Sequence, residues 1–331
     1  MSEWSKLKVL YLTDDRESYS RGNYYVAYQR AFVRQTTVTL AHPLEPLPDP
    51  AGFDLVVFGH ASIEHYGRIR GAQYIPPRLL PHLWWRRSSL RALRRTRTPK
   101  IVFTKNDYKK QEIKDGFLQY VRPQIAVIQH RNAIPLYKTP PGGRLQWVPF
   151  GVDTEMFSPP ADPIPVSARS FVLGFRASTN GKWNGDVRER FYNALHRLEG
   201  RMPVALSLDT RGRNFLVGQP YVDWIRSCAL LGNSVSALGA VGPKFLEAMA
   251  CDTPPIAPTH AYEDLLRPHE HYVPVDPGEH GTFPGLEAAV ERYVSDPAYQ
   301  QQLRHHGLEL VRAHSVYEHV RGLLRDTVSR R

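Results

Sequence analysis

Short apolar segments alternate with helix-like segments along the chain, and the whole pattern occurs twice. In the first half, β-rich runs are expected at residues 8–13, 36–40, 54–59, 101–104, 125–129 and 145–149, with helices at 24–34, 78–97 and 109–120. Fully apolar runs such as residues 55–58 (LVVF) are typical of strands buried on both faces. Their alternation with helices predicts a parallel sheet covered by helices on both sides.

The pattern resumes after a proline-rich stretch at residues 158–165 (SPPADPIP), which we interpret as an interdomain linker. Strands are expected at 171–175, 203–208, 234–238, 253–257 and 272–275, and helices at 186–198, 221–231, 243–250, 262–266 and from 285 onward. We therefore expect an α/β fold of two doubly wound Rossmann-like domains facing across a ligand-binding cleft. The expected bounds are 1–155, 166–310, and 311–331 for a C-terminal helix that packs back on the first domain.

Composition excludes several protein classes. Hydrophobic residues make up 42% of the 331-residue chain, which is enough to build real cores and excludes wholesale disorder. The two cysteines, Cys228 and Cys251, are too few for a disulfide framework or a four-thiolate zinc site. No apolar run approaches the roughly 20 residues that span a bilayer, and residues 1–8 lack the apolar core of a signal peptide. We expect a soluble, cytoplasmic protein.

The positive charge of the chain is concentrated in one segment. There are 43 Lys+Arg against 32 Asp+Glu, and residues 65–106 contain no acidic residue but eleven basic ones, which equal the whole excess. These are Arg68, Arg70, Arg78, Arg86, Arg87, Arg91, Arg94, Arg95, Arg97, Lys100 and Lys105. A surface built for solubility mixes both signs, so this segment predicts an anionic partner, with a plain solvated face as the alternative.

Three motifs in the middle and second half resemble nucleotide-sugar glycosyltransferases of the GT-B fold. Residues 150–159 (FGVDTEMFSP) resemble the joint between the two domains of these enzymes. Residues 175–182 (FRASTNGK) resemble the loop that holds the donor diphosphate, and the resemblance implies this role for Arg176 and Lys182. Paired cations suit the two negative charges of a pyrophosphate. Residues 242–255 (GPKFLEAMACDTPP) resemble the donor-binding helix.

The resemblance of this helix implies specific donor contacts. Glu247 would accept hydrogen bonds from the ribose hydroxyls, because a carboxylate offers two acceptor oxygens to a vicinal diol. Lys244, one turn earlier, would reach a phosphate. The alternative is an ordinary surface Lys–Glu pair. Many retaining members carry another glutamate eight residues before this one, where the present chain has Gly239. That departure favours inversion over the common retaining mechanism.

The version without the upstream glutamate is closer to CgeB-like proteins and to phage DNA β-glucosyltransferases. FDLVVFGHAS, IVFTKND and VLGFRAS resemble segments of the phage enzyme. That resemblance implies a catalytic role for Asp107, with Lys105 and Asn106 as neighbouring alternatives. His60 and Asp14, with its neighbour Asp15, are further candidate bases, because they follow predicted strands. A capping role for the aspartates and a structural role for His60 are the alternatives. Gly22 lies in a loop that would approach the diphosphate.

No metal site or resident cofactor is expected. The sequence has no Asp-x-Asp motif, and His269-Glu270-His271 is more typical of a solvated loop than of a metal site. There is no Gly-x-Gly-x-x-Gly after the first strand, which argues against a dinucleotide-dependent dehydrogenase. The nucleotide-sugar, with a UDP-sugar favoured, would be a co-substrate.

The acceptor class follows from the basic segment. Arg86, Arg87, Arg91, Arg94 and Arg95 would bind DNA phosphates, with a flipped 5-hydroxymethylpyrimidine base as the hydroxyl acceptor. An anionic membrane surface contacted by the neighbouring leucines and tryptophans, or a small-molecule acceptor, is the alternative. A second alternative is a non-catalytic nucleic-acid-binding protein on the same scaffold.

Overall fold

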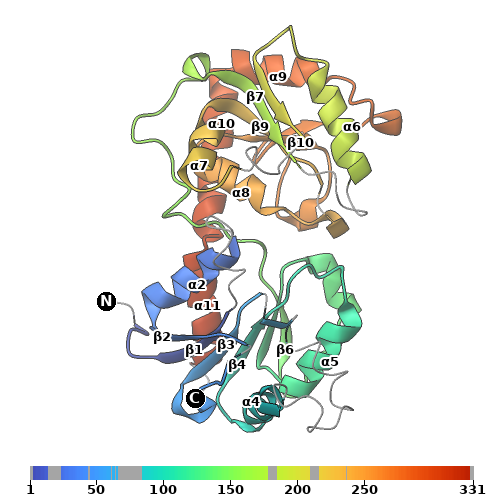
Figure 1. The fold of residues 1–331 in the computed structure, drawn as a ribbon. Coiled ribbons are helices and arrows are strands. Elements are labelled where there is room, and N and C mark those ends of the chain that lie inside the picture. Colours follow the sequence, from blue (N-terminus) through green and yellow to red (C-terminus); the bar gives the residue numbers. More distant parts are fainter. Residues whose placement is uncertain are drawn as a thin grey trace. The chain divides into compact units, whose positions relative to one another are not determined.

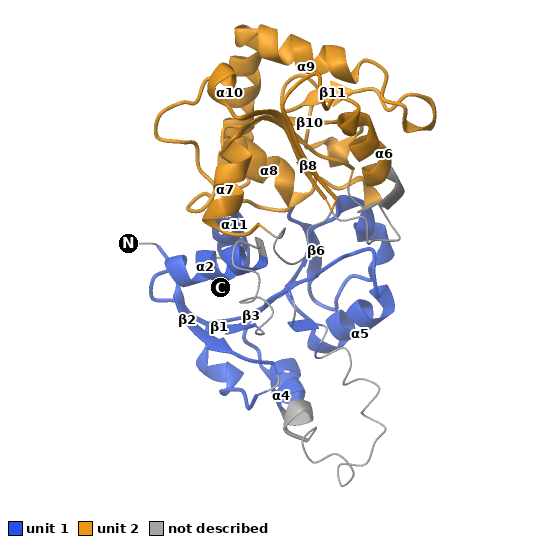
Figure 2. Ribbon diagram, turned by 45° about the horizontal axis from the view of Figure 1, so that its top comes forward, with its two compact units in different colours: residues 1–149, 316–331 blue, residues 150–315 orange. Residues whose placement is uncertain are grey.

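The structure divides the chain into two compact units. The computed structural model describes residues 3–13, 24–43, 45–60, 62–63, 65, 84–177, 185–208, 216–235 and 237–328. Unit 1 comprises residues 1–149 and 316–331, and unit 2 comprises residues 150–315 (Figure 2). The chain therefore changes unit at residue 150 and returns at residue 316, whereas the sequence analysis placed these changes near residues 155 and 311.

Unit 1 is built on a six-stranded parallel sheet. The strands are β1 (Lys8–Leu12), β2 (Thr37–Ala41), β3 (Leu55–Phe58), β4 (Lys100–Phe103), β5 (Ile125–Ile128) and β6 (Arg144–Trp147). Their order is β2-β1-β3-β4-β5-β6, and every neighbouring pair is parallel. The order reverses between β1 and β3, which is where open sheets of this kind bind ligands.

Helices cover both faces of this sheet (Figure 1). They are α2 (Tyr24–Gln35), α4 (Trp84–Arg95), α5 (Gln111–Val121) and α11 (Val316–Val328), with 3₁₀ turns at Pro50–Gly52 and Arg131–Leu136. Side chains alternate along a strand, so Val9 and Tyr11 face the α2 and α11 core while Leu10 and Leu12 face the α4 and α5 core. The last helix of the chain thus belongs to the first unit.

Unit 2 has a five-stranded parallel sheet. Its strands are β7 (Phe171–Arg176), β8 (Val204–Ser207), β9 (Cys228–Gly232), β10 (Pro255–Pro258) and β11 (Val273–Val275), in the order β11-β10-β9-β7-β8. Its helices are α6 (Gly185–His196), α7 (Gln219–Arg226), α8 (Pro243–Ala250), α9 (Leu286–Ser295) and α10 (Pro297–Ala313). Shorter 3₁₀ turns lie at Val166–Ala168, Ala237–Gly239, Tyr262–Asp264 and Glu279–Gly281. The expected pair of parallel sheets with helices on both faces is confirmed.

Three expected elements of unit 2 are wrong. The helix expected at 221–231 ends at Arg226, and the apolar run Cys228–Gly232 is instead the central strand β9. The described residues of 234–238, which exclude residue 236, form no strand. The helix expected at 262–266 is only the turn Tyr262–Asp264. An apolar run of five residues fits a helix or a buried strand equally well, and only its place in the sheet separates them.

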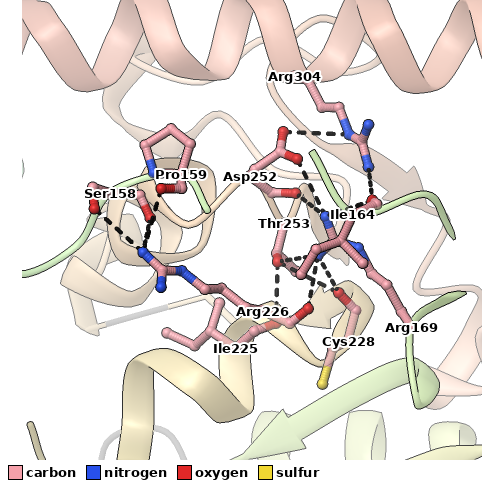
Figure 3. A network of polar contacts seen from close by, with 10 residues as sticks. All are labelled: Ser158, Pro159, Ile164, Arg169, Ile225, Arg226, Cys228, Asp252, Thr253 and Arg304. Carbon is pink, nitrogen blue, oxygen red and sulfur yellow. Dashed lines mark hydrogen bonds and ion pairs between the residues drawn. The ribbon is translucent and has the colours of Figure 1, made fainter. Parts of the chain in front are cut away.

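The proline-rich stretch lies within unit 2 and is fixed there by hydrogen bonds from arginine side chains (Figure 3). The Arg169 guanidinium donates to the carbonyl oxygens of Cys228 and Asp252, both at 2.8 Å, and to Thr253 Oγ1 at 2.8 Å. Arg226 donates to the carbonyl oxygen of Ser158 at 2.6 Å. These contacts join the segment after residue 158 to the edges of α7, β9 and α8, so it is anchored rather than a free linker.

Candidate functional site

Polar residues gather where the strand order of the unit 2 sheet reverses. The reversal lies between β7 and β9. Arg176 is the last residue of β7, and β9 ends at Gly232, directly before the buried Asn233. Ligands of open parallel sheets bind beyond the carboxyl ends of the strands at such a reversal, so a site is expected here.

The structure brings together three of the residues predicted to hold a donor. Lys244 Nζ donates a hydrogen bond to the main-chain carbonyl oxygen of Arg176. Lys244 and Glu247 stand three residues apart on α8 and therefore share a face of that helix. The Arg176 guanidinium lies over the indole of Trp224, 5.4 Å from the ring centroid. Two cations and one carboxylate thus converge from β7 and α8.

Glu247 is an internal carboxylate rather than a solvated surface group. Its residue is 7% exposed, and the Tyr221 hydroxyl donates to its Oε2 at 3.2 Å. Burial raises the pKa of Glu247, although Lys244 and the Tyr221 hydrogen bond act in the opposite direction. Burial lowers the pKa of Lys244, against the attraction of Glu247. A ligand that offers hydroxyl donors to the carboxylate and negative charge to the ammonium group would stabilise both charged forms.

Three further predicted site residues cannot be placed beside these. Lys182, Gly22 and Asp14 lie outside the described residues. The described part of the predicted donor site therefore consists of Arg176, Lys244 and Glu247 with the α7 side chains that touch them.

Gly239 occupies a position that does not suit a glutamate. Its backbone φ is +73°, in the left-handed region that residues with a Cβ disfavour. A Cβ placed there would lie 2.6 Å from Nε2 of His260. A glutamate at this position would be strained and would displace the His260 ring, so the departure seen in the sequence has a structural counterpart.

Asp107 lies after β4 and is completely buried. Its Oδ2 accepts hydrogen bonds from the main-chain N–H groups of Gln129 (2.9 Å) and His130 (3.1 Å), and its Oδ1 accepts from the hydroxyls of Tyr137 (2.9 Å) and Thr104. Burial pushes its pKa upward, but the hydrogen bonds from His130 and Thr104, together with charge interactions with His130 and Lys114, outweigh burial and hold the pKa at about 2. A carboxylate of this kind is a weak base, so the geometry does not favour direct proton abstraction by Asp107.

The structure instead pairs Asp107 with His130, a residue that sequence reasoning missed. His130 Nδ1 lies 2.9 Å from Asp107 Oδ2. A carboxylate at this nitrogen fixes the ring orientation and leaves Nε2 as the basic nitrogen of the neutral imidazole. Asp107 and His130 follow β4 and β5, which are neighbours in the sheet, so the adjacency of these strand ends was the signal that could have found the pair.

His60 lies near the strand-order reversal of unit 1, two residues after the end of β3, but inside an aromatic cluster. Its ring centroid is 4.4 Å from that of Tyr25, 5.5 Å from Tyr28 and 4.7 Å from Phe103, and the residue is completely buried. Burial and the nearby charge of Lys105 lower its pKa to about 3, so the ring is neutral at pH 7. This packing favours a structural role.

Helix α4 presents arginines on one side and leucines on the other. Arg91, Arg94 and Arg95 are exposed, whereas Leu90 and Leu93 are buried in the core against the sheet. This is the arrangement of an amphipathic helix on a sheet, and the exposed side carries no acidic residue of its own.

The rest of the basic segment contributes unequally. Arg86 and Arg87 belong to α4, but their side chains lie outside the described part of the structure. Lys100 is buried, and its Nζ donates to the carbonyl oxygens of Thr96 (3.1 Å) and Thr98 (3.2 Å). Burial lowers the pKa of Lys100. Lys100 therefore forms hydrogen bonds with the segment that follows α4, and its side chain is not exposed for contact with a partner.

Within the described residues, no group of three or more His, Cys, Asp or Glu side chains is arranged to hold a metal ion. In the segment 269–271, His269 Nδ1 lies 3.0 Å from the Tyr299 hydroxyl, and His271 Nδ1 accepts a hydrogen bond from the Arg267 main chain at 2.9 Å. Both histidines thus have local structural partners. Among the described helices, none combines the length and apolar character needed to cross a bilayer.

Comparison with known proteins extends these observations. Residues 186–324 match the family model described as glycosyl transferase-like. This range begins in α6, contains Lys244 and Glu247 on α8, and ends in α11. No curated protein sequence matches the chain.

Solved structures resemble the whole chain. The HepE protein of Anabaena, solved in complex with UDP and glucose, is 11% identical, with 96% of this chain and 99% of that one covered and a TM-score of 0.60. Sucrose-phosphate synthase of Thermosynechococcus elongatus is 14% identical, covering 97% and 98%, with a TM-score of 0.60. A glycosyltransferase of Rickettsia africae is 10% identical, covering 97% and 98%, with a TM-score of 0.58.

The chain therefore carries a glycosyltransferase-like domain on a GT-B fold. The predicted fold class and the predicted enzyme class, a glycosyltransferase, are confirmed at this level. The narrower likenesses to CgeB-like proteins and to phage DNA β-glucosyltransferases stay predictions.

Proposed function

We propose that this GT-B protein transfers a sugar from a UDP-sugar to a hydroxyl acceptor. The observation that carries the proposal is the convergence of Arg176, Lys244 and Glu247 at the strand-order reversal of unit 2. Arg176, Lys244 and the predicted Lys182 would neutralise the diphosphate, and Glu247 would accept hydrogen bonds from the ribose hydroxyls. The HepE structures with UDP and with UDP-glucose support this choice of donor.

The proposed reaction is a displacement at the anomeric carbon of the donor. The acceptor oxygen forms a bond to this carbon as the bond from carbon to the diphosphate oxygen breaks, and the electron pair of that bond leaves with UDP. The hydroxyl proton passes to a base of the protein. Cations beside the diphosphate favour the step because negative charge grows on the leaving oxygen. Gly239 in place of a second glutamate supports inversion of configuration.

We place the base in unit 1. Asp14 stays a candidate, and the role first assigned to Asp107 passes to His130, with Asp107 as its positioning residue. An imidazole oriented by a carboxylate at Nδ1 can accept the acceptor's proton at Nε2, whereas Asp107, whose pKa is held at about 2, is a weak base. His60 is the weakest of the candidates because aromatic rings surround it.

Donor binding tests the proposal directly. Thermal-shift measurements with a panel of nucleotide sugars should show stabilisation by a UDP-sugar, because a ligand that binds only the folded state raises its stability. Glu247→Ala and Arg176→Ala should abolish that shift, while Glu291→Ala and Arg312→Ala, which remove exposed side chains of the same unit, should preserve it. Normal donor binding by both site variants would overturn the site assignment.

For the acceptor, we propose a hydroxyl on a modified base in DNA, such as a 5-hydroxymethylpyrimidine. The exposed arginines of α4 support this choice, because phosphate contacts by arginine dominate the affinity of proteins for DNA. Leu90 and Leu93 on the opposite face are buried in the core, so neither of these two side chains is available for insertion into a lipid surface.

Salt dependence tests the acceptor. Binding of a DNA duplex that contains 5-hydroxymethylcytosine should weaken steeply as salt rises. The triple variant Arg91→Ala, Arg94→Ala, Arg95→Ala should reduce the slope of log affinity against log salt concentration by the amount expected for about three phosphate contacts. Replacement of Arg267, Arg292 and Arg312 in unit 2 removes the same charge elsewhere and is the matched control. Undetectable binding at low salt would exclude DNA. DNA binding without sugar transfer would favour the non-catalytic alternative.

A further inference from the structure

Helix α7 places two aromatic side chains against the donor site. Tyr221 and Trp224 are three residues apart on this helix and stack nearly parallel, with ring centroids 6.0 Å apart and an interplanar angle of 14°. Tyr221 also packs against Phe157 in an edge-to-face arrangement, with ring centroids 6.1 Å apart and an interplanar angle of 86°. The Tyr221 ring therefore contacts two aromatic neighbours, which restrict the position of its hydroxyl.

Each ring of this pair touches one of the proposed donor-binding residues. The Tyr221 hydroxyl donates to Glu247 Oε2 at 3.2 Å, and the Trp224 indole supports the Arg176 guanidinium at 5.4 Å. The glutamate and the arginine come from different elements, α8 and β7. One rigid aromatic stack therefore contacts the groups proposed for the ribose and for the diphosphate.

We propose that Tyr221 is a positioning residue for Glu247, holding its carboxylate ionised and oriented for the ribose hydroxyls of the donor. The proposal rests on the function proposed above for Glu247. Packing alone does not require a tyrosine, because phenylalanine would fill the same space between Phe157 and Trp224. What the hydroxyl adds is a hydrogen bond to the charged form of a buried acid, which such an acid needs.

The groups around Glu247 determine whether loss of the Tyr221 hydroxyl raises or lowers the pKa of Glu247. Lys244 and Tyr221 act on it directly, and Cys251, the residue after α8, stays neutral because burial raises its pKa to about 12. Arg176 and Arg188 act on Lys244 in turn. The Tyr221 hydroxyl stabilises the carboxylate, so its loss raises the pKa of Glu247 and extends the neutral acid to higher pH.

The test follows the ionisation of Glu247 in the free protein. Protein labelled with ¹³C in the glutamate carboxyls is titrated by NMR, and Glu247→Gln identifies the Glu247 signal by its disappearance. Tyr221→Phe should raise the midpoint of that signal by about one pH unit. Tyr262→Phe is the matched control, because it removes the buried hydrogen bond from a tyrosine hydroxyl to Pro258 in the same core cluster without touching Glu247.

UDP affinity gives the functional readout. The dissociation constant of Tyr221→Phe should rise several-fold at neutral pH and approach the wild-type value as pH is raised, whereas a packing defect would weaken binding equally at every pH. An unchanged midpoint, or a loss of affinity independent of pH, overturns the proposal for Tyr221. A raised midpoint with no UDP binding by wild type overturns the proposed function instead, and leaves the ionic coupling of Tyr221 and Glu247 supported.

Discussion

At the scale of single residues, the two carboxylates that matter most have opposite surroundings. Asp107 is buried with donors at both oxygens, which hold its pKa at about 2. Glu247 is buried with one hydroxyl donor and one ammonium group, and its pKa is raised. The first is a fixed anion suited to orient another group. The second responds to a ligand, because hydroxyl donors would favour its charged form.

The fixed charge of Asp107 predicts a pH effect on stability. Its pKa of about 2 in the folded protein is below the ordinary 3.8, so its contribution is present above about pH 4 and is lost as pH falls towards 2. Asp107→Asn should lower the free energy of unfolding by about 3 kcal/mol at pH 7. The substitution replaces the carboxylate that accepts from the main-chain N–H groups of Gln129 and His130 with a neutral amide. Denaturant unfolding between pH 7 and pH 2 should show the difference from wild type shrinking at the acid end.

The companion variant separates structure from catalysis. His130→Gln keeps a side chain of similar size at the Asp107 pair and should lower kcat by about 100-fold or more with little change in donor affinity, if His130 is the base. Unchanged kcat in a folded His130→Gln protein would return the role to Asp14.

At the scale of secondary-structure elements, most of the fold could be predicted from local pattern. Strand β3 was predictable because LVVF is an all-apolar run, and helix α8 was predictable because PKFLEAMA matches a family motif. The boundary between α7 and β9 was not predictable, because no Gly or Pro separates Arg226 from Cys228. Contacts between elements were not predictable either. The pairs Asp107–His130 and Tyr221–Glu247 are 23 and 26 residues apart and arise only when the sheet is assembled.

Arg169 gives the prediction that belongs to this scale. Its side chain is fully buried and ties the segment before β7 to the ends of α7 and α8 (Figure 3). Arg169→Lys keeps the charge but cannot reproduce the forked donors, so it should lower the thermal stability of unit 2 by about 3 kcal/mol. Arg312→Ala, an exposed arginine of the same unit, should change stability by less than about 0.5 kcal/mol. Equal melting temperatures for Arg169→Lys and wild type would contradict this account.

At the scale of the whole molecule, unit 1 is built from two separate parts of the chain, one before unit 2 and one after it. Unit 1 is completed by α11, whose Val316, Val320, Leu323 and Leu324 belong to the same core cluster as Tyr11 and Phe32. The chain must therefore pass through all of unit 2 before the first unit has its full core. The family match starts in α6 of unit 2 and ends in α11 of unit 1, so it includes residue 316, where the chain re-enters unit 1.

Because α11 packs in the core of unit 1, a substitution near the C-terminus should destabilise the N-terminal strands. Leu324→Ala removes a fully buried side chain and should cost unit 1 about 3 kcal/mol of stability, because the cavity opens in the core that β1 and α2 share. Hydrogen exchange followed by mass spectrometry should show faster exchange in peptides covering β1 and β3, with β9 and β10 of unit 2 unaffected. Arg325→Ala, the exposed neighbour, should leave both units at wild-type rates. If β9 and β10 lost protection together with β1, the two units would unfold as one, and α11 would stabilise the whole chain rather than its first unit.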